Sequence, residues 1–246
     1  LPTRVNLNLS SLSMVLSAKK EPLCFYGAPL NILSLGRNLK RWVEHFLWPV
    51  ECPVCGRIAS TGCLSCLENL IHNPIIRELG GDLTLMSGST HHDTCRDLVL
   101  RLKYRGYGQL GVVMGQALAK VLPPVDCDAL VPIPLHKQSR RPWNQAKLIA
   151  KGIAMEWRVP VVELLVWNPK AGFQTSYSSI ERRLMAENAL VFKGVRRGRQ
   201  QVRAVVLIDD VSTTGTTLRR AACTLSEHSI SVKKAITWST SLRYYR

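Results

Sequence analysis

The stretch VVLIDDVSTTGTTL, residues 205 to 218, decides which fold this chain adopts. It opens with four apolar residues without polar alternation, a pattern typical of a strand that is buried on both faces of a parallel sheet. Two adjacent carboxylates, Asp209 and Asp210, end this run, and a loop of small hydroxyl residues follows. From Leu218 to about Ser226 the apolar spacing becomes helical. This order predicts a phosphate site at the carboxyl end of a sheet strand.

The loop contains residue types that suit a phosphate group. Backbone N–H groups and the positive end of the following helix attract an anion, and Gly215 permits the unusual dihedrals of such a loop. The two carboxylates suit ribose hydroxyls or a hydrated magnesium ion. The predicted phosphate-binding residues are Ser212, Thr213, Thr214, Gly215, Thr216 and Thr217.

Other nucleotide sites also begin with a hydrophobic strand and an acidic residue. A Walker B strand needs a Walker A loop, and the chain has no G-x-x-x-x-G-K-[ST] sequence. A dinucleotide site needs G-x-G-x-x-G after the strand, and none follows this one. An ordinary turn between a strand and a helix is the remaining alternative.

Four cysteines near the N-terminus form two C-x-x-C pairs, separated by seven residues. Each turn can place two thiolates on one ion, and four thiolates in a tetrahedron select zinc in a structural role. Two disulfides or a redox pair are the alternatives, but disulfides are rare in the cytoplasm and one redox pair does not explain two. The predicted zinc ligands are Cys52, Cys55, Cys63 and Cys66.

The chain of 246 residues carries a formal net charge of +16. Most of this excess follows residue 130, where 20 Lys and Arg face 7 Asp and Glu. Such a surface attracts phosphates of a small ligand or of nucleic acid, although a solvated face is the ordinary alternative. The densest cluster, predicted to contact nucleic acid, consists of Lys193, Arg196, Arg197, Arg199 and Arg203.

The length suits one α/β domain with a small appendage. No apolar run reaches the ~18–20 residues of a membrane span, and no secretory signal pattern appears, so we expect a cytoplasmic location. The first residue is Leu1 and the first methionine is Met14. We therefore expect residues 1–13 to lie upstream of the true start or to form a disordered extension.

Strands and helices alternate through the body of the chain. The expected strands are 83–86, 129–133, 161–166, 190–192, 203–208 and 234–238; the expected helices are 95–104, 110–121, 144–157, 178–188 and 218–226. Such alternation predicts a parallel or mixed sheet with helices on both faces. We expect three parts: an extension with a short helix (1–48), a four-cysteine module (49–70) and an α/β domain (71–246).

The stretch VPIPLHKQSRRPWNQA, residues 131 to 146, is the second informative segment. Its strand ends at two prolines, which fix an extended exit from the sheet. Loops at the carboxyl ends of strands line the ligand crevice of an α/β sheet. Lysine and arginine there suit a diphosphate, so His136 and Lys137 are predicted to bind one, with a basic surface loop as the alternative.

The acidic loop resembles the phosphoribosyl pyrophosphate (PRPP) loop of type I phosphoribosyltransferases. That resemblance implies that the loop holds the 5′-phosphate, and that Asp209 and Asp210 hold the ribose 2′- and 3′-hydroxyls. With the four cysteines and the proline-ended strand, in this order from Cys52 to Trp238, the chain resembles the ComF and GntX proteins. These are phosphoribosyltransferase-like proteins linked to DNA uptake and the use of external DNA. The implied fold is a parallel sheet flanked by helices, with a small N-terminal zinc-binding module.

The same resemblance implies a flexible segment, residues 170–192, that closes over the diphosphate. Arg182 or Arg183 would then supply a cation to the leaving group, although both also fit the exposed face of a short helix. The family pattern after the proline strand is close to P-L-H-x-x-R-x-R-x-G-F-N-Q-A. Pro142 and Trp143 replace the usual Gly and Phe, so we expect a stiffer loop.

Two functions fit these motifs. The first is a phosphoribosyltransferase that displaces diphosphate from C1 of PRPP with the help of magnesium, with an unknown acceptor. The second is a non-catalytic module that binds nucleotide or single-stranded DNA, with helicase and recombination-loading proteins as the partners that the family implies. A regulator that reads duplex DNA fits less well, because seven residues between the cysteine pairs leave no room for a recognition helix.

Overall fold

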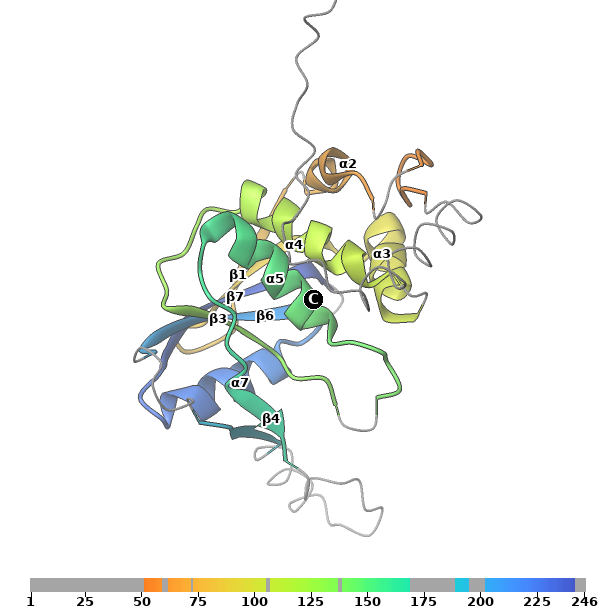
Figure 1. Ribbon diagram of the computed structural model, residues 1–246. Coiled ribbons are helices and arrows are strands. Elements are labelled where there is room, and N and C mark those ends of the chain that lie inside the picture. Colours follow the sequence, from red (N-terminus) through yellow and green to blue (C-terminus); the bar gives the residue numbers. More distant parts are fainter. Residues whose placement is uncertain are drawn as a thin grey trace, which may run out of the picture. The chain divides into compact units, whose positions relative to one another are not determined.

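A five-stranded mixed sheet in the order β1-β2-β7-β6-β3 forms the centre of the computed structural model (Figure 1). The structure describes residues 51–58, 62–71, 73–104, 107–136, 139–168, 189–194 and 202–241. The strands are β1 (Ile75–Glu78), β2 (Thr84–Thr90), β3 (Ala129–Pro132), β6 (Ala204–Ser212) and β7 (Ser231–Thr240). β2, β7, β6 and β3 are parallel, and β1 is antiparallel to β2. The predicted fold class, a mostly parallel sheet flanked by helices, is confirmed.

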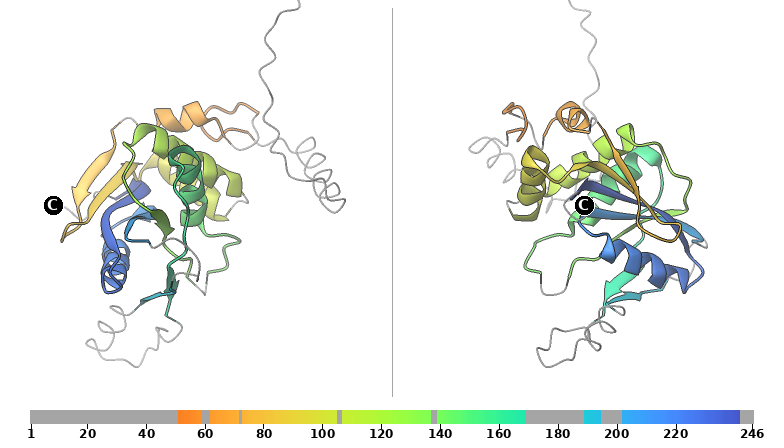
Figure 2. Two further views of the ribbon diagram at one scale, coloured as in Figure 1. Left: turned by 60° about the vertical axis from the view of Figure 1, so that its left-hand side comes forward. Right: turned by 180° about the vertical axis from the view of Figure 1, so that it is seen from behind.

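Helices cover both faces of this sheet (Figures 1 and 2). α4 (Gly108–Val121) and α5 (Gln145–Trp157) lie on one face, whereas α7 (Thr216–Ser226) lies on the other. Val206 and Ile208 of β6 join the core under α4 and α5, while Val205 and Leu207 join the core under α7. This two-sided burial explains why the sequence of β6 is apolar without alternation.

Helices α4 and α5 touch backbone to backbone at a pair of glycines. A Cβ added to Gly115 would lie 2.0 Å from the carbonyl oxygen of Ile149, and one added to Gly152 would lie 2.0 Å from that of Val112. No side chain fits at either position, because such a contact is far inside van der Waals separation.

The four-cysteine segment shares the core of the α/β domain. Its helix α2 (Leu64–Asn69) buries Leu67 completely, in the same cluster as Met114 and Leu118 of α4. α3 (Asp93–Tyr104) adds Leu98 and Leu102 to that cluster. The four-cysteine segment is therefore anchored by apolar packing against the α/β domain.

The sequence-based elements differ from the structure in two respects, the unpredicted short elements and the placement of two strands. α2 and β1 were not predicted, because both are short and lack a clear apolar period. β4 (Leu165–Trp167) pairs antiparallel with β5 (Leu190–Phe192), so the strands expected at 161–166 and 190–192 form a separate small sheet. The predicted helices near 38–48 and 178–188 lie outside the described residues.

The prediction that the β6 strand stops before the acidic pair was wrong. β6 continues to Ser212, because β7 pairs with it as far as Thr240. The hydroxyl residues at the end of β7 extend the ladder without adding an apolar signal, so periodicity could not reveal it. Among the described residues, no helix combines the length and the apolar character that crossing a membrane requires.

We expect Gly115→Ala to lower the free energy of unfolding by about 3 kcal/mol, near the upper end of ordinary overpacking costs. The added methyl group would force α4 and α5 apart. Urea denaturation measures the change, and Gly108→Ala on the same helix is the matched control. A Cβ at Gly108 would meet the Trp143 ring at 3.5 Å, an ordinary contact. Equal effects of the two substitutions would contradict the close-packing argument.

Candidate functional site

The acidic pair lies at the carboxyl end of β6, between β7 and β3. Asp210 is 7% exposed, and its backbone N–H donates to Oδ1 of Asp209 at 2.8 Å. Nζ of Lys103, at the end of α3, lies 2.9 Å from Oδ2 of Asp210. Two carboxylates and one ammonium group, contributed by segments 106 residues apart in the chain, therefore form one cluster.

The electrostatics of this cluster favour a bound cation or hydroxyl donors. Burial, followed by the negative charge of Asp210, raises the pKa of Asp209 to about 8. The Asp210 amide and the charges of Lys103 and Arg141 oppose this shift but do not cancel it. Negative charge in this place is thus incompletely balanced, and a ligand that donates hydrogen bonds or brings a cation relieves it.

The predicted phosphate loop turns sharply between β6 and α7. Gly215 has a φ of +74°, and a Cβ there would lie 2.7 Å from Leu79, so this turn requires glycine. The hydroxyl oxygens of Thr214 and Thr216 are 2.8 Å apart. α7 begins at Thr216, so its free N–H groups directly follow the loop, as an anion site requires.

Two arginines hold this loop, and sequence reasoning missed both. Arg77 of β1 donates from Nη2 to the carbonyl oxygen of Thr213 at 3.1 Å and to Oγ of Ser212 at 3.4 Å. Arg219 of α7 donates from Nη1 to the carbonyl oxygen of Thr214 at 3.1 Å and from Nη2 to Oγ1 of Thr216 at 3.3 Å. They fix the loop and add positive charge near the predicted phosphate position. No local sequence pattern indicates this role of Arg77, because 135 residues separate it from Ser212.

The other predicted hydroxyl residues, Ser212, Thr213 and Thr217, occupy different environments. Ser212 is buried, and its carbonyl oxygen accepts hydrogen bonds from the Thr240 hydroxyl at 3.0 Å and from the Ser241 amide at 2.9 Å. Thr213 is exposed, and Thr217 is half-buried in the first turn of α7. Ser212 thus supports the end of the strand, whereas Thr213 faces solvent.

The loop after β3 leaves the sheet beside the acidic pair. The amide of Ile133 donates to the carbonyl oxygen of Ile208 at 2.9 Å, which keeps the two strand ends together. His136 packs its ring against Trp167, with centroids 5.2 Å apart. Lys137 lies outside the described residues. His136 therefore lies beside β4, and its role in the ligand site stays a prediction.

Trp143 and Asn144 anchor the far end of that loop. Trp143 donates from Nε1 to the carbonyl oxygen of Leu102 at 2.9 Å, which ties the loop to the last turn of α3. Asn144 caps α5: its Oδ1 accepts from the amide of Lys147 at 3.1 Å, and its Nδ2 donates to the carbonyl oxygen of Ile133 at 2.9 Å. The tryptophan thus serves as an aromatic anchor in this chain.

The predicted nucleic-acid cluster is only partly described. Lys193 and Arg203 are exposed, and Arg203 precedes β6, at the opposite end of the strand from the acidic pair. The other predicted cations lie outside the described residues: Arg196, Arg197 and Arg199, together with Arg182 and Arg183. These arginines stay predictions.

The four predicted zinc ligands come together. The Sγ atoms of Cys52, Cys55, Cys63 and Cys66 all lie within 4.8 Å of one another. The Sγ atoms of Cys55 and Cys63 are 3.8 Å apart, and two thiolates on a tetrahedral zinc ion with Zn–S bonds of about 2.3 Å would be separated by about 3.8 Å. The cluster can therefore hold a metal ion, and its size suits zinc.

The thiols of this cluster perturb one another strongly. Burial raises the pKa of Cys52, but hydrogen bonds from the backbone amides of Cys63, Cys55 and Val54 outweigh it and lower that pKa to about 6. A hydrogen bond with Cys55, then burial and the charge of Cys52, raise the pKa of Cys66 to about 12. The cluster thus favours one thiolate, and ionisation of a second thiol is unfavourable unless a bound cation neutralises the added negative charge.

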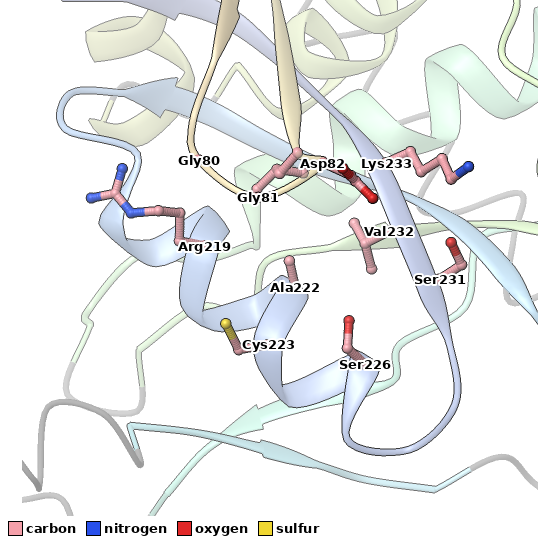
Figure 3. A pocket seen from close by; sticks show the side chains of 11 residues that line it. Gly80, Gly81, Asp82, Arg219, Ala222, Cys223, Ser226, Ser231, Val232 and Lys233 are labelled. Carbon is pink, nitrogen blue, oxygen red and sulfur yellow. The ribbon is translucent and has the colours of Figure 1, made fainter.

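A separate cavity of about 520 Å³ lies between α7, the β1–β2 turn and the start of β7 (Figure 3). Gly80, Gly81 and Asp82 of the turn form one wall, and Cys223 and Ser226 of α7 form another. Neither carboxylate of the acidic pair lines it. It is therefore distinct from the predicted ligand site.

We expect Asp209→Asn to raise the melting temperature at neutral pH. In the folded state Asp209 holds its proton up to about pH 8, while the unfolded chain releases it near the ordinary value of 3.8, so stability falls as the pH rises between them. An amide avoids this loss and still accepts the Asp210 N–H. Each pKa unit is worth about 1.4 kcal/mol, so melting curves should show a gain of several degrees at about pH 8 and little gain at about pH 4.

Asp128→Asn is the control, because the pKa of Asp128 is shifted in the opposite direction to that of Asp209. Asp128 accepts hydrogen bonds from the amides of Arg203 at 2.8 Å and Ala204 at 2.9 Å, and these lower its pKa. Its contribution to stability is present at neutral pH and disappears as the pH falls through its lowered value. A decrease in melting temperature for Asp209→Asn at about pH 8 would contradict the charge argument.

Two curated relatives are competence proteins. Competence protein ComFC of Bacillus subtilis is 29% identical over 199 residues, which covers 79% of this chain and 77% of the relative. Competence protein F of Haemophilus influenzae is 34% identical over 94 residues, which covers 37% of this chain and 41% of the relative. No family model matches the chain. The recognition of the ComF family from the three sequence motifs is confirmed by these homologues.

The similar solved structures include phosphoribosyltransferases. Glutamine PRPP amidotransferase from B. subtilis, complexed with ADP and GMP, is 26% identical with a TM-score of 0.36, over 52% of this chain and 26% of that enzyme. Adenine phosphoribosyltransferase from Leishmania tarentolae is 14% identical with a TM-score of 0.36, over 68% and 82% of the two chains. Both TM-scores are low, and the sheet topology establishes the fold class by itself. The chain is a homologue of the ComF competence proteins, with a mostly parallel α/β fold and a four-cysteine cluster before it.

Proposed function

We propose that this chain binds PRPP at the carboxyl edge of its sheet and acts in the uptake or use of external DNA, in the cytoplasm. One observation carries the PRPP proposal: an acidic pair, only partly balanced by Lys103, lies directly beside a helix-terminal hydroxyl loop. Asp209 and Asp210 suit a diol, and the Gly215 turn before α7 suits a phosphate. A phosphorylated sugar presents both groups in one molecule.

The neighbouring elements complete the proposed site. The 5′-phosphate would lie on residues 212–217, and the ribose hydroxyls on the acidic pair. The diphosphate would extend toward the loop after β3, where His136 and Lys137 follow the strand end. Magnesium would neutralise charge on the departing diphosphate, and the incompletely balanced charge at Asp209 fits a nearby cation. Arg182 and Arg183 would add a further positive charge from residues 169–188.

A catalytic version of this site would transfer the phosphoribosyl group. The bond between C1 and the diphosphate oxygen would break, the electron pair would leave with diphosphate, and a nucleophile of the acceptor would bond to C1. The alternative is a non-catalytic module that keeps the ligand site within a DNA-handling complex. Both versions share the same binding step, so binding is the first quantity to measure.

The proposed role in DNA handling is supported by charge and by the relatives. The net charge of +16 favours contact with phosphates, and the two curated relatives are named as competence proteins. Single-stranded DNA would contact the cluster from Lys193 to Arg203, and helicase and recombination-loading proteins are the proposed partners. We propose three parts for the chain: 1–48, the zinc module 49–70 and the ligand-binding domain 71–246.

We expect the purified chain to bind PRPP in calorimetric titration, and more tightly with magnesium than without it. Asp210→Asn should weaken binding at least tenfold, because hydrogen bonds to charged groups contribute about 1.5–3 kcal/mol. Asp126→Asn, an exposed acid that lies before β3, is the matched control and should bind like the wild type. Absence of wild-type binding at millimolar PRPP would exclude the PRPP proposal and leave the single-stranded DNA module.

We propose that the metal in the four-cysteine cluster is a structural zinc ion. Metal analysis of the purified chain should then find about one zinc per chain, which a strong chelator removes with loss of stability. Cys55→Ser should abolish zinc retention, whereas Cys223→Ser, at an exposed cysteine of α7, should retain it. Zinc retained in full by Cys55→Ser would exclude the four-thiolate site.

A further inference from the structure

The ion pair between Lys103 and Asp210 connects the ligand site to a part of the chain that no motif marked. The two side chains are 16% and 11% exposed, and Nζ lies 2.9 Å from Oδ2. A partly buried pair at this distance is more than a surface contact, because each partner loses hydration that the other must replace. Among the described residues, Lys103 is the cation in ion-pair contact with the acidic pair.

The position of Lys103 is fixed by its helix. Its neighbour Leu102 is fully buried, and the carbonyl oxygen of Leu102 accepts the indole N–H of Trp143 at 2.9 Å. The carbonyl groups of a last helical turn lack helical partners, so this bond locks the end of α3. Tyr104 lies under the guanidinium of Arg141, 5.7 Å from its ring centroid. Lys103 therefore directly follows a buried, anchored residue of α3.

The neighbouring His91 does not compete with Lys103 for the charge of Asp210. His91 follows β2 and binds the Ser239 hydroxyl through Nδ1 at 2.8 Å. Burial and the charges of Lys103 and Arg96 lower the pKa of His91, so its ring is neutral near pH 7 and offers no competing charge. Lys103 thus supplies the cation in direct contact with the Asp210 carboxylate, while Arg141 acts on the pair through its charge.

We propose that Lys103 is a positioning residue for ribose: it holds Oδ2 of Asp210, so that Oδ1 stays available to accept a sugar hydroxyl. The inference rests on the proposed function, since it concerns the same site. An ammonium group has three donors, of which one binds Asp210, and its side chain is tied by packing. Without Lys103 the carboxylate would be both less oriented and more costly to keep charged. The effect is specific to the sugar, because the phosphate loop has its own arginines.

The test is calorimetric titration of the full chain with two probes, ribose 5-phosphate and inorganic phosphate. Lys103→Met should weaken the binding of ribose 5-phosphate by roughly 10- to 100-fold, the value of a lost charged hydrogen bond, and leave that of phosphate within about twofold. Lys103→Arg should restore at least part of the sugar affinity. Lys147→Met is the matched control, because Lys147 forms an exposed pair with Glu163 at 2.8 Å and lies outside the site.

Other outcomes separate the inference from the proposed function. Unchanged sugar affinity in Lys103→Met, or equal loss for both probes, overturns the positioning role while the ligand site stands. In an Asp210→Asn background, Lys103→Met should change sugar binding little, and additive losses would also overturn it. If Lys103→Met fails to fold, Lys103→Gln, which also removes the charge but keeps a polar side chain, replaces it in each titration. A wild type that binds neither probe rejects the proposed function, and the inference falls with it.

Discussion

Burial of β6 on both faces is the constraint on which the rest of this structure depends. Val206 and Ile208 pack under α4 and α5, and Leu207 packs under α7, so the strand cannot be displaced without opening both cores. Its carboxyl end is therefore a rigid support. The side chains that follow the apolar run are therefore held in fixed positions at the edge of the sheet, as functional groups on a rigid element should be.

The acidic pair lies on this rigid strand end, and its negative charge lowers the stability of the folded chain. Burial of the strand end, and after it the repulsion between the two adjacent carboxylates, raise the pKa of Asp209. Cations from three distant elements contact the acidic pair or the loop that follows it: Lys103 from α3, Arg77 from β1 and Arg219 from α7. Lys103 pairs with the Asp210 carboxylate, whereas the two arginines donate hydrogen bonds to carbonyl groups of the loop.

Close packing on the opposite face connects the four-cysteine cluster to this site. α2 packs its Leu67 against α4, which meets α5 at the Gly115–Gly152 contact. α5 begins at the Asn144 cap, which binds the end of β3 next to β6. A continuous set of packed elements therefore runs from the cysteines to the ligand edge, which is consistent with a structural role for a bound metal ion.

The local sequence determined much of this protein. The apolar run before Asp209, the Gly215 turn and the two C-x-x-C pairs predicted the central strand, the loop and the metal cluster, because each is a short-range pattern with its own physical signature. Only the tertiary structure decided which cations meet these groups. Lys103 is a residue of an amphipathic helix and Arg77 a residue of a short edge strand, and neither position differs locally from an ordinary basic residue. Their roles arise from contacts across more than 100 residues, which the pairing of β1, β2, β7 and β6 and the packing of α3 bring about.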